Sequence, residues 1–456
     1  MVRPSPVSVA ARWLMLLALG LGFLGTPAAA QQVLRDAETE LFFRDLARPL
    51  AQAAGLRPEN LEIVLLQSNE INAFVVGGQR VYFYSGLLEA AESVNEVEGV
   101  VAHELGHITG GHIIRSQEAF GTATSITLVS LLLGVAAIAA GAGEAGMGLL
   151  GLGQQAALGQ FLAYNRTQES AADQAGAAYL AKAGISGRGS LAFFKKLQNQ
   201  EFRLAIPQDD SYGRTHPLTG DRLAALETSY KADPAWNRAP DPRLEARFQR
   251  IRAKLFGFAQ DPKRTLVRYP ETDRSVPARY ARAYGWHKSA YPEKAQAEVD
   301  ALLAAAPADP FFLELKGQVS LESGKPAEAL ASLRRAVALA PDQPLIAALL
   351  GHALIATEDP KNFAEAKTVL RSAVARDPSN PFAWYQLGIV YDREGDTARA
   401  SLATAERYAL EGRPQLALAS AEAALHGIPA GTPDHLRAQD LAMVAKAEAE
   451  KQKKDR

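Results

Sequence analysis

Two histidines and a glutamate stand in the run His103-Glu104-Leu105-Gly106-His107. On a helix, residues four apart lie about 40° apart around the axis, so His103 and His107 would share one face. Two imidazoles on one face can bind a single zinc ion, and Glu104 is placed to take a proton from a water molecule there. Because this pattern is short, its meaning depends on the helix that carries it and on a third ligand.

The flanking sequence predicts a helix over residues 94–111. Ser93 and Glu96 form a capping box at its start, and Gly110-Gly111 ends it. An apolar stripe at helical spacing consists of Val94, Val97, Val101, Leu105 and Ile108. His112 would lie about 140° around the axis from His107. We therefore interpret it as a surface histidine or one that supports a ligand, and not as a ligand.

A second helix is predicted to start within Asn165–Asp173 and to continue over residues 175–183. Glu169 and Asp173 are four residues apart and share a face of that helix. Two histidines and one glutamate would leave a fourth zinc position open for water, which is the catalytic arrangement. Asp173 could accept a hydrogen bond from the far nitrogen of a ligand histidine. Taken alone, Glu169 is equally compatible with a solvated helix residue.

A third histidine, His216, follows a polar loop over residues 208–214, and Pro217 stiffens the chain after it. His216 could stabilise an oxyanion, or occupy the fourth zinc position in a resting enzyme. A surface-loop histidine is the third interpretation. Arg222 lies on a short helix predicted over residues 221–230, where an active-site role and a structural ion pair are both compatible with the sequence.

Three apolar runs predict strands over residues 61–66, 72–76 and 80–84, after a helix over residues 36–54. Gly77-Gly78-Gln79 predicts a hairpin between the last two strands. Zinc peptidases bind substrate as an added strand on a sheet edge. Residues 72–78 are therefore the candidate substrate edge, and a purely structural strand is the alternative. The edge residues are Asn72, Ala73, Phe74 and Val75.

Composition places the chain among ordinary globular proteins of two or three domains. It has 456 residues, of which 48% are hydrophobic and 22% are charged. The formal net charge of −1 gives no reason to expect a nucleic-acid partner. The sequence contains no cysteine, which excludes disulfides, cysteine metal ligands and a thiol nucleophile.

Residues 1–30 have the pattern of an export signal. Arg3 and Arg12 precede or flank an apolar segment over residues 13–24, and Ala28-Ala29-Ala30 is a small-residue cleavage site. The mature chain would begin at Gln31, and export without cysteine fits a bacterial periplasm. A retained membrane anchor is the alternative.

Glu144 is the only charged residue within residues 119–165. The segment 122–140 is apolar but rich in threonine, serine and glycine. Three interpretations remain open: a helical hairpin beside the active site that acts as a lid, peripheral contact with a membrane surface, and a true membrane span.

The C-terminal third has an internal repeat of about 34 residues. Gly317 and Gly351 are 34 residues apart, and Gly388 follows after 37 because three extra residues fall within 357–363. Each unit is predicted to be a pair of helices, and stacked pairs form a concave surface for extended partners. An ordinary helical bundle is the alternative. We predict a metallopeptidase domain over 31–260, a polar and irregular connector over 261–275, and a repeat domain over 276–456.

With these residues in view, the chain resembles the periplasmic beta-barrel assembly-enhancing proteases. These are zinc metallopeptidases of the group that includes the CAAX prenyl protease and the heat-shock protease HtpX, fused to tetratricopeptide repeats. The resemblance covers nearly the whole mature chain. It rests on the repeats and on four short motifs: residues 103–107, residues 169–173, Thr215-His216-Pro217 and Asn72-Ala73-Phe74.

The resemblance implies an α+β gluzincin-type domain followed by an all-α tetratricopeptide-repeat solenoid. It also implies that His103, His107 and Glu169 bind one zinc ion per chain and that Glu104 is the general base. The implied role is cleavage of misfolded or stalled outer-membrane proteins, with repeats that bind the substrate or the beta-barrel assembly machinery. The alternative is a chaperone or scaffold with a latent or vestigial peptidase site; a complete set of ligands and base argues against it.

Overall fold

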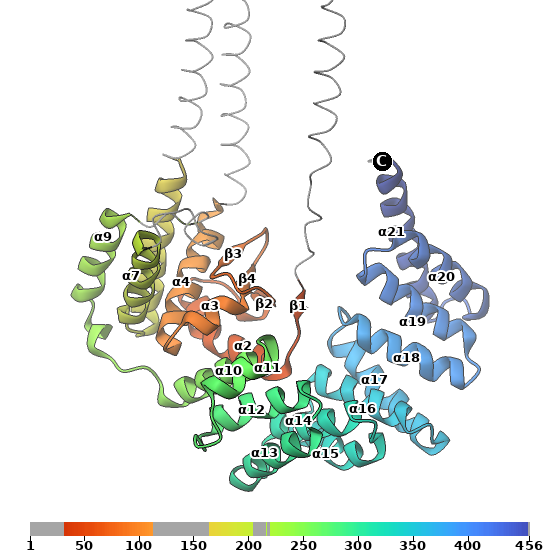
Figure 1. Ribbon diagram of the computed structural model, residues 1–456. Helices are drawn as coiled ribbons and strands as arrows, with labels where there is room; N and C mark the ends of the chain where they lie inside the picture. The colour runs from red at the N-terminus through yellow and green to blue at the C-terminus, as the bar shows by residue number, and fades with distance from the viewer. Residues whose placement is uncertain (1–31, 113–163, 204–215, 217–218, 455–456) are drawn as a thin grey trace, which may run out of the picture.

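The computed structural model describes residues 32–112, 164–203, 216 and 219–454. A mixed α+β domain is followed by a curved stack of helices (Figure 1). The domain contains β1 (Val33–Leu34), α2 (Ala37–Ala53), η1 (Pro58–Asn60), β2 (Glu62–Leu66), β3 (Ala73–Val75), β4 (Arg80–Tyr84), α3 (Ser85–Ala90), α4 (Val94–Gly110), a helix over residues 164–183, α7 (Arg188–Arg203), α9 (Gly220–Ala232), η2 (Pro234–Asn237) and α10 (Pro242–Ala259).

The sheet has four strands in the order β1-β2-β4-β3. β2 and β4 are parallel, whereas β1 pairs antiparallel with β2 and β3 pairs antiparallel with β4. The three predicted strands are confirmed, each within a residue of its predicted ends. β3 lies at the edge of the sheet, and Phe74 pairs with Tyr82 in the register of the hairpin.

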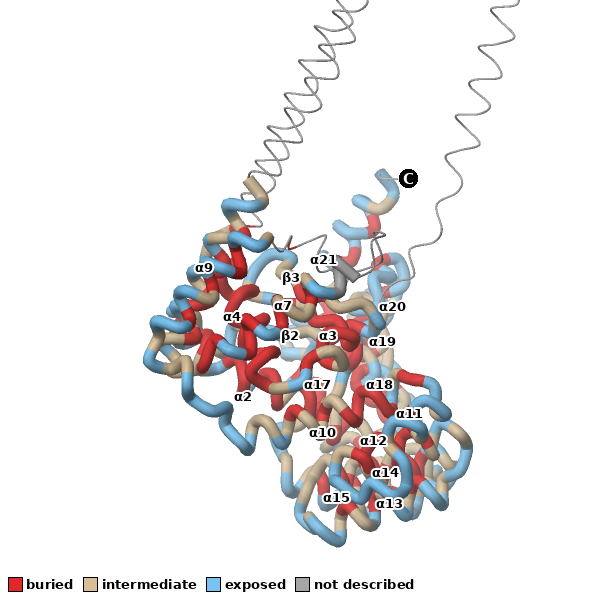
Figure 2. The backbone as a smooth tube through the Cα atoms, turned by 60° about the vertical axis from the view of Figure 1, so that its left-hand side comes forward, coloured by how far each residue is buried: buried red, intermediate tan, exposed pale blue. Residues whose placement is uncertain are grey.

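Helix α4 lies at the centre of the domain. The Ser93 hydroxyl accepts from the Glu96 backbone N–H at 3.4 Å, and Gly111 ends the helix in the left-handed region at φ 63°. Every residue from Val94 to His107 is buried (Figure 2). The predicted apolar stripe is therefore only one of several buried faces, because β3, α2, α7 and the helix over residues 164–183 surround α4.

Glycines allow these helices to approach closely. A Cβ atom on Gly106 would come within 2.6 Å of the Ala172 carbonyl oxygen. A Cβ atom on Gly99 would come within 2.4 Å of Ser190 Cβ. Backbones at this distance place the side chains of α4 next to those of the helix over residues 164–183, where Glu169 lies.

The C-terminal region is a stack of antiparallel helix pairs, as the repeat predicts (Figure 1). In each of two repeats, a glycine of the first helix faces a leucine of the second, Gly317 against Leu333 and Gly351 against Leu370. The helices are α12 (Val276–Lys288), α13 (Pro292–Ala305), α14 (Pro310–Glu322), α15 (Pro326–Leu339), α16 (Pro344–Ala356), η3 (Pro360–Asn362), α17 (Phe363–Arg376), α18 (Pro381–Arg393), α19 (Thr397–Leu410), α20 (Pro414–Gly427) and α21 (Pro433–Lys454).

The segment predicted to be an irregular connector is partly helical. It forms α11 (Pro262–Arg268), whose N-cap Asp261 accepts from the Lys263 backbone N–H at 2.8 Å. The expectation of an irregular chain was wrong because a capping aspartate followed by proline is a helix-start signal even in a polar segment. Helix α10 packs against α12 as well as against α2 and α4, so the stack continues directly from the first domain.

Residues near the start of α2 join the two regions. Lys254 on α10 is buried and pairs with Asp36 at 2.5 Å, and Arg250 pairs with Asp309 of the repeats. The Tyr280 hydroxyl donates to Glu38 at 2.8 Å. Ala37 packs among repeat residues, which are Leu313, Ala336 and Ile346.

Two predicted features lie outside the described residues, namely the export signal over 1–30 and the apolar segment 122–140. Within the part of the chain that the structure describes, no helix has the length and apolarity that crossing a membrane requires.

Candidate metal centre

The three predicted ligands converge in space together with His216. His103 and His107 project from one face of α4, and Glu169 comes from the adjoining helix; all of these side chains are buried. One ligand atom from each of the four residues lies within 4.8 Å of the others. The ligand atoms are Nε2 of His103 and His107, a carboxylate oxygen of Glu169 and Nδ1 of His216.

The spacing of these atoms fits a tetrahedral zinc ion. Zinc bonds of about 2.0–2.1 Å to nitrogen and oxygen imply a tetrahedron whose edge is about 3.3–3.4 Å. His103 Nε2 is 3.1 Å from His107 Nε2 and 3.3 Å from His216 Nδ1. Glu169 Oε2 is 3.4 Å from His103 Nε2 and 3.1 Å from His216 Nδ1, whereas Glu169 Oε1 is 3.3 Å from His107 Nε2. Two imidazoles and a carboxylate are also the donor types of catalytic zinc sites. The residues present therefore fit the ion.

Asp173 and Arg222 lie directly behind His103 and Glu169. Asp173 Oδ1 is 3.0 Å from His103 Nδ1, the nitrogen that faces away from the other ligands. Arg222 donates to both oxygens of Asp173, through Nε at 2.7 Å and Nη2 at 2.9 Å, and its Nη2 is 3.2 Å from Glu169. One guanidinium thus fixes the carboxylate behind His103 and one ligand carboxylate.

Glu104 is fully buried beside the ligands. In the described part of the chain neither of its carboxylate oxygens accepts a hydrogen bond, although Oε1 is 3.7 Å from His216 Nε2. Burial raises the pKa of Glu104, and the nearby His216 and His103 only partly oppose this. A carboxylate with two unoccupied oxygens and a raised pKa can accept and return a proton.

The side chains at the centre shift one another's pKa values in opposite directions. Burial alone would lower the pKa of His103, but its contacts with Asp173 and Glu169 raise it to about 10. Burial lowers the pKa of His107 to about 3. Burial would raise the pKa of Glu169, but His216 and the other two histidines lower it well below its usual range.

His216 lies between the ligand cluster and the sheet edge. Its Nδ1 is 3.1 Å from Glu169 Oε2, and its Nε2 is 3.2 Å from the Ala73 carbonyl oxygen. It is buried, so the surface-loop interpretation is wrong. The ring can be buried because each of its nitrogens has a polar partner, one on the helix over residues 164–183 and one on β3.

The predicted edge strand is at the rim of the site. The Asn72 backbone carbonyl accepts from the Tyr84 backbone N–H at 2.9 Å, so the backbone groups of Asn72 and, two residues later, Phe74 point toward β4. By alternation, the backbone groups of Ala73 and Val75 face the open edge of the sheet. The Ala73 carbonyl that contacts His216 is therefore one that an added strand would use.

His112 lies closer to the metal centre than its position in the sequence predicts. Its Nδ1 is 2.9 Å from His107 Nδ1, and the residue is buried, so it does not face away from the centre. The 140° offset assumed a continuing helix, whereas the chain turns at Gly111 and brings the ring back over the last turn. A glycine pair before a histidine is the signal that could have predicted this contact. Because His107 Nε2 faces the other ligands, His112 contacts the back of the ring and supports the ligand.

Comparisons with known proteins agree with this geometry. The model of Peptidase family M48 matches residues 38–229, and that of the tetratricopeptide repeat matches residues 312–343. A beta-barrel assembly-enhancing protease of Yersinia pestis is 25% identical over 412 residues, which cover 87% of this chain and 81% of that protein. The protein of that name in Escherichia coli strain K12 is 26% identical over 381 residues, which cover 81% of this chain and 75% of that protein. Metalloprotease LoiP of Escherichia coli strain K12 is 28% identical over 41% of this chain and 69% of LoiP. The chain is therefore a metalloendopeptidase in which a domain that matches Peptidase family M48 is followed by tetratricopeptide repeats.

Proposed function

We propose that the protein is a zinc-dependent endopeptidase of the periplasm that cleaves misfolded or stalled outer-membrane proteins. The observation that carries the proposal is the convergence of His103, His107 and Glu169, whose nitrogen and oxygen atoms lie 3.1–3.4 Å apart, beside the unoccupied carboxylate of Glu104. Such a set is complete for hydrolysis of a peptide bond, with two histidines, one carboxylate ligand and one base.

Each residue around the centre has a distinct task in this mechanism. When bound, the zinc ion supplies Lewis acidity for the scissile carbonyl and the attacking water. Glu104 accepts a proton from that water and passes it to the leaving amine nitrogen. Asp173 and Arg222 hold His103 in orientation, and the outward backbone groups of β3 align an extended substrate whatever its sequence.

We propose that His216 holds the site in a resting form in this structure. Its Nδ1 fills the fourth corner of the ligand set and its Nε2 meets the Ala73 carbonyl oxygen. If His216 moved away, the fourth ligand position would become open to the reacting carbonyl. The Ala73 carbonyl oxygen would at the same time become free to accept from the substrate backbone. Stabilisation of the oxyanion by His216 is the alternative role, and the two roles predict opposite effects of its removal.

The substrate, partner and compartment are inferred from three further observations. Two relatives that align with most of the chain are named for beta-barrel assembly. Tetratricopeptide stacks present concave surfaces to extended partners, which suits capture of unfolded chains or docking on an assembly machinery. Residues 1–30 have the pattern of an export signal.

The test compares the purified mature chain with Glu104→Gln and His216→Ala, using unfolded outer-membrane protein and casein as substrates and measuring bound zinc. Glu104→Gln should retain zinc and lose cleavage, because it removes the proton acceptor but no ligand. His216→Ala should cleave faster than the wild type if the histidine blocks the site, and more slowly if it stabilises the oxyanion. Absence of zinc from a wild type that cleaves would refute zinc as the metal, and absence of cleavage by all three forms would favour a latent site and a scaffold that acts through its repeats.

A further inference from the structure

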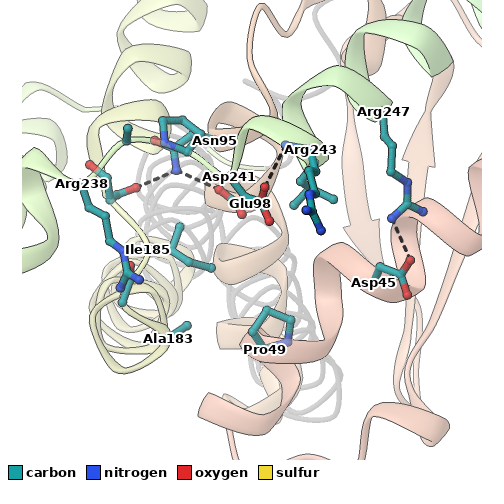
Figure 3. Close-up of a pocket in the computed structure, with 15 residues that line it drawn as sticks. Asp45, Pro49, Asn95, Glu98, Ala183, Ile185, Arg238, Asp241, Arg243 and Arg247 are labelled. Atoms are coloured by element: carbon teal, nitrogen blue, oxygen red, sulfur yellow. Dashed lines mark hydrogen bonds and ion pairs between the residues drawn. The ribbon is translucent and has the colours of Figure 1, made fainter.

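A pocket lies on the far side of α4 from the metal centre. It has a volume of about 470 Å³, and elements far apart in the sequence surround it: α2, the start of α4, the turn at residues 183–186 and the start of α10. Figure 3 shows Asn95, Glu98, Ile185 and Pro49 around this space. Glu98 precedes His103 by five residues, so the two side chains point about 140° apart around α4.

Glu98 is the chemical feature of this pocket. Only 6% of the residue is exposed, and its Oε2 accepts from Asn95 Nδ2 at 3.0 Å. Asn95 is itself buried and donates to the Ser186 carbonyl at 2.8 Å, which fixes its orientation. Among the described residues, the second oxygen of Glu98 has no hydrogen-bond donor. This oxygen is not fully buried, so a donor that enters the pocket can reach it.

The charges around Glu98 favour a cation as that donor. Burial raises the pKa of Glu98 to about 7; the Asn95 hydrogen bond opposes the shift, while the negative charges of Glu245 and Asp241 add to it. Three arginines also line the pocket: Arg247 donates to Asp45, Arg238 donates to the Gly184 carbonyl, and the exposed Arg243 is not among the charges that shift the pKa of Glu98.

The walls of the pocket favour an aliphatic stem behind that cation. Pro49, Ile185, Pro240 and Leu244 line the space together with Glu98. A primary ammonium group on a flexible methylene chain combines an apolar body with a charged head, as a lysine side chain does. We propose that this pocket binds an alkylammonium group, presented either by a lysine of a polypeptide or by a free polyamine, with the ammonium on Glu98 and the stem against these apolar walls.

The test is isothermal titration of the full-length zinc-loaded protein at pH 7 with Nα-acetyl-lysine amide and with 1,5-diaminopentane. At this pH both amines are protonated and are poor metal ligands. Saturable binding of either probe supports the proposal. A preference for the lysine derivative identifies a polypeptide as the source, and a preference for the diamine identifies a polyamine. Binding of neither probe, or equal binding of butyrate, would overturn it.

Variants test whether the amine binds in this pocket or elsewhere on the surface. Glu98→Gln keeps the size of the side chain and should weaken binding at least tenfold, whereas Glu59→Gln, at an exposed glutamate outside the pocket, should change it less than twofold. Ala183→Leu, which narrows the wall without altering Glu98, should also weaken binding at least tenfold. Unchanged affinity in both pocket variants, with unfolding temperatures like that of the wild type, would refute the assignment.

Discussion

The close approach of α4 to the helix over residues 164–183 predicts the effect of Gly106→Ala on the metal centre. A Cβ atom at this position would lie 2.6 Å from the Ala172 carbonyl oxygen, whereas ordinary contacts begin at 3.4 Å. The two backbones must therefore separate by 3.4 − 2.6, or about 0.8 Å. Neither contact atom belongs to a flexible side chain, so the strain cannot be relieved by a rotamer change.

This separation would act on the ligands, because Ala172 lies three residues after Glu169 on the same helix. If Glu169 moves with its backbone, the 3.3 Å distance from its Oε1 to His107 Nε2 grows to about 4.1 Å. Metal–ligand distances tolerate changes of only about 0.2 Å. We expect zinc affinity to fall roughly 10–100-fold, the range seen when support of a ligand is lost.

Competition with a chromophoric chelator measures this affinity, and cleavage of casein should fall in parallel. Overpacking costs about 1–3 kcal/mol, and the better helix propensity of alanine offsets about 1 kcal/mol, so the protein should remain folded. Gly220→Ala is the matched control, because a Cβ atom there meets nothing within 4 Å. Zinc affinity of Gly106→Ala within twofold of the wild type would refute the link between the close approach and the ligand geometry.

Two further predictions concern buried charges. Arg222→Lys keeps the charge but loses the two-pronged contact with Asp173, so zinc affinity measured with the same chelator should fall roughly tenfold or more; wild-type affinity would show that the guanidinium is dispensable. Glu314, in α14, has a buried Oε2 without a hydrogen-bond partner in the described residues, and burial raises its pKa to about 8. Because the folded chain binds this proton more tightly than the unfolded chain, its contribution to stability is present below about pH 4.5 and is lost as the pH rises through 8. In urea unfolding, the difference in the free energy of unfolding between Glu314→Gln and the wild type should therefore grow by roughly 3–5 kcal/mol in favour of the variant as the pH rises from 4.5 to 9. Free energies of unfolding that change with pH in the same way in both proteins would contradict this.

The elements that carry the site were predictable because their signals are local. The cap at Ser93, the glycine end of α4 and the hairpin glycines each dictate a backbone conformation within a few residues. The spacing of His103 and His107 then follows from helical geometry alone. The repeat was predictable for a similar reason, since close helix crossings require small residues at a fixed period.

Contacts across the chain could not be predicted in the same way. The pairing of His216 with the Ala73 carbonyl joins residues 143 positions apart, and nothing in either local sequence specifies the other. His112 was misplaced because a helical angle was extended past the residue where the helix ends. The pocket at Glu98 depends on four separate segments, and its glutamate is indistinguishable in sequence from a solvated residue near a helix start.

The residues that follow the predicted export signal bind the two regions of the protein together. Val33 pairs with Leu66 in the sheet, Arg35 pairs with Asp377 of the repeats at 2.7 Å, and Asp36 both caps α2 and pairs with Lys254. Arg250 of α10 also pairs with Asp309 of the repeats. A hinge motion of the repeats would have to break the contacts of Arg35 and Arg250 together with the apolar packing around Ala37. The repeat region is therefore held at a fixed orientation to the peptidase domain, so that a chain bound by the repeats lies at a defined distance from the metal centre.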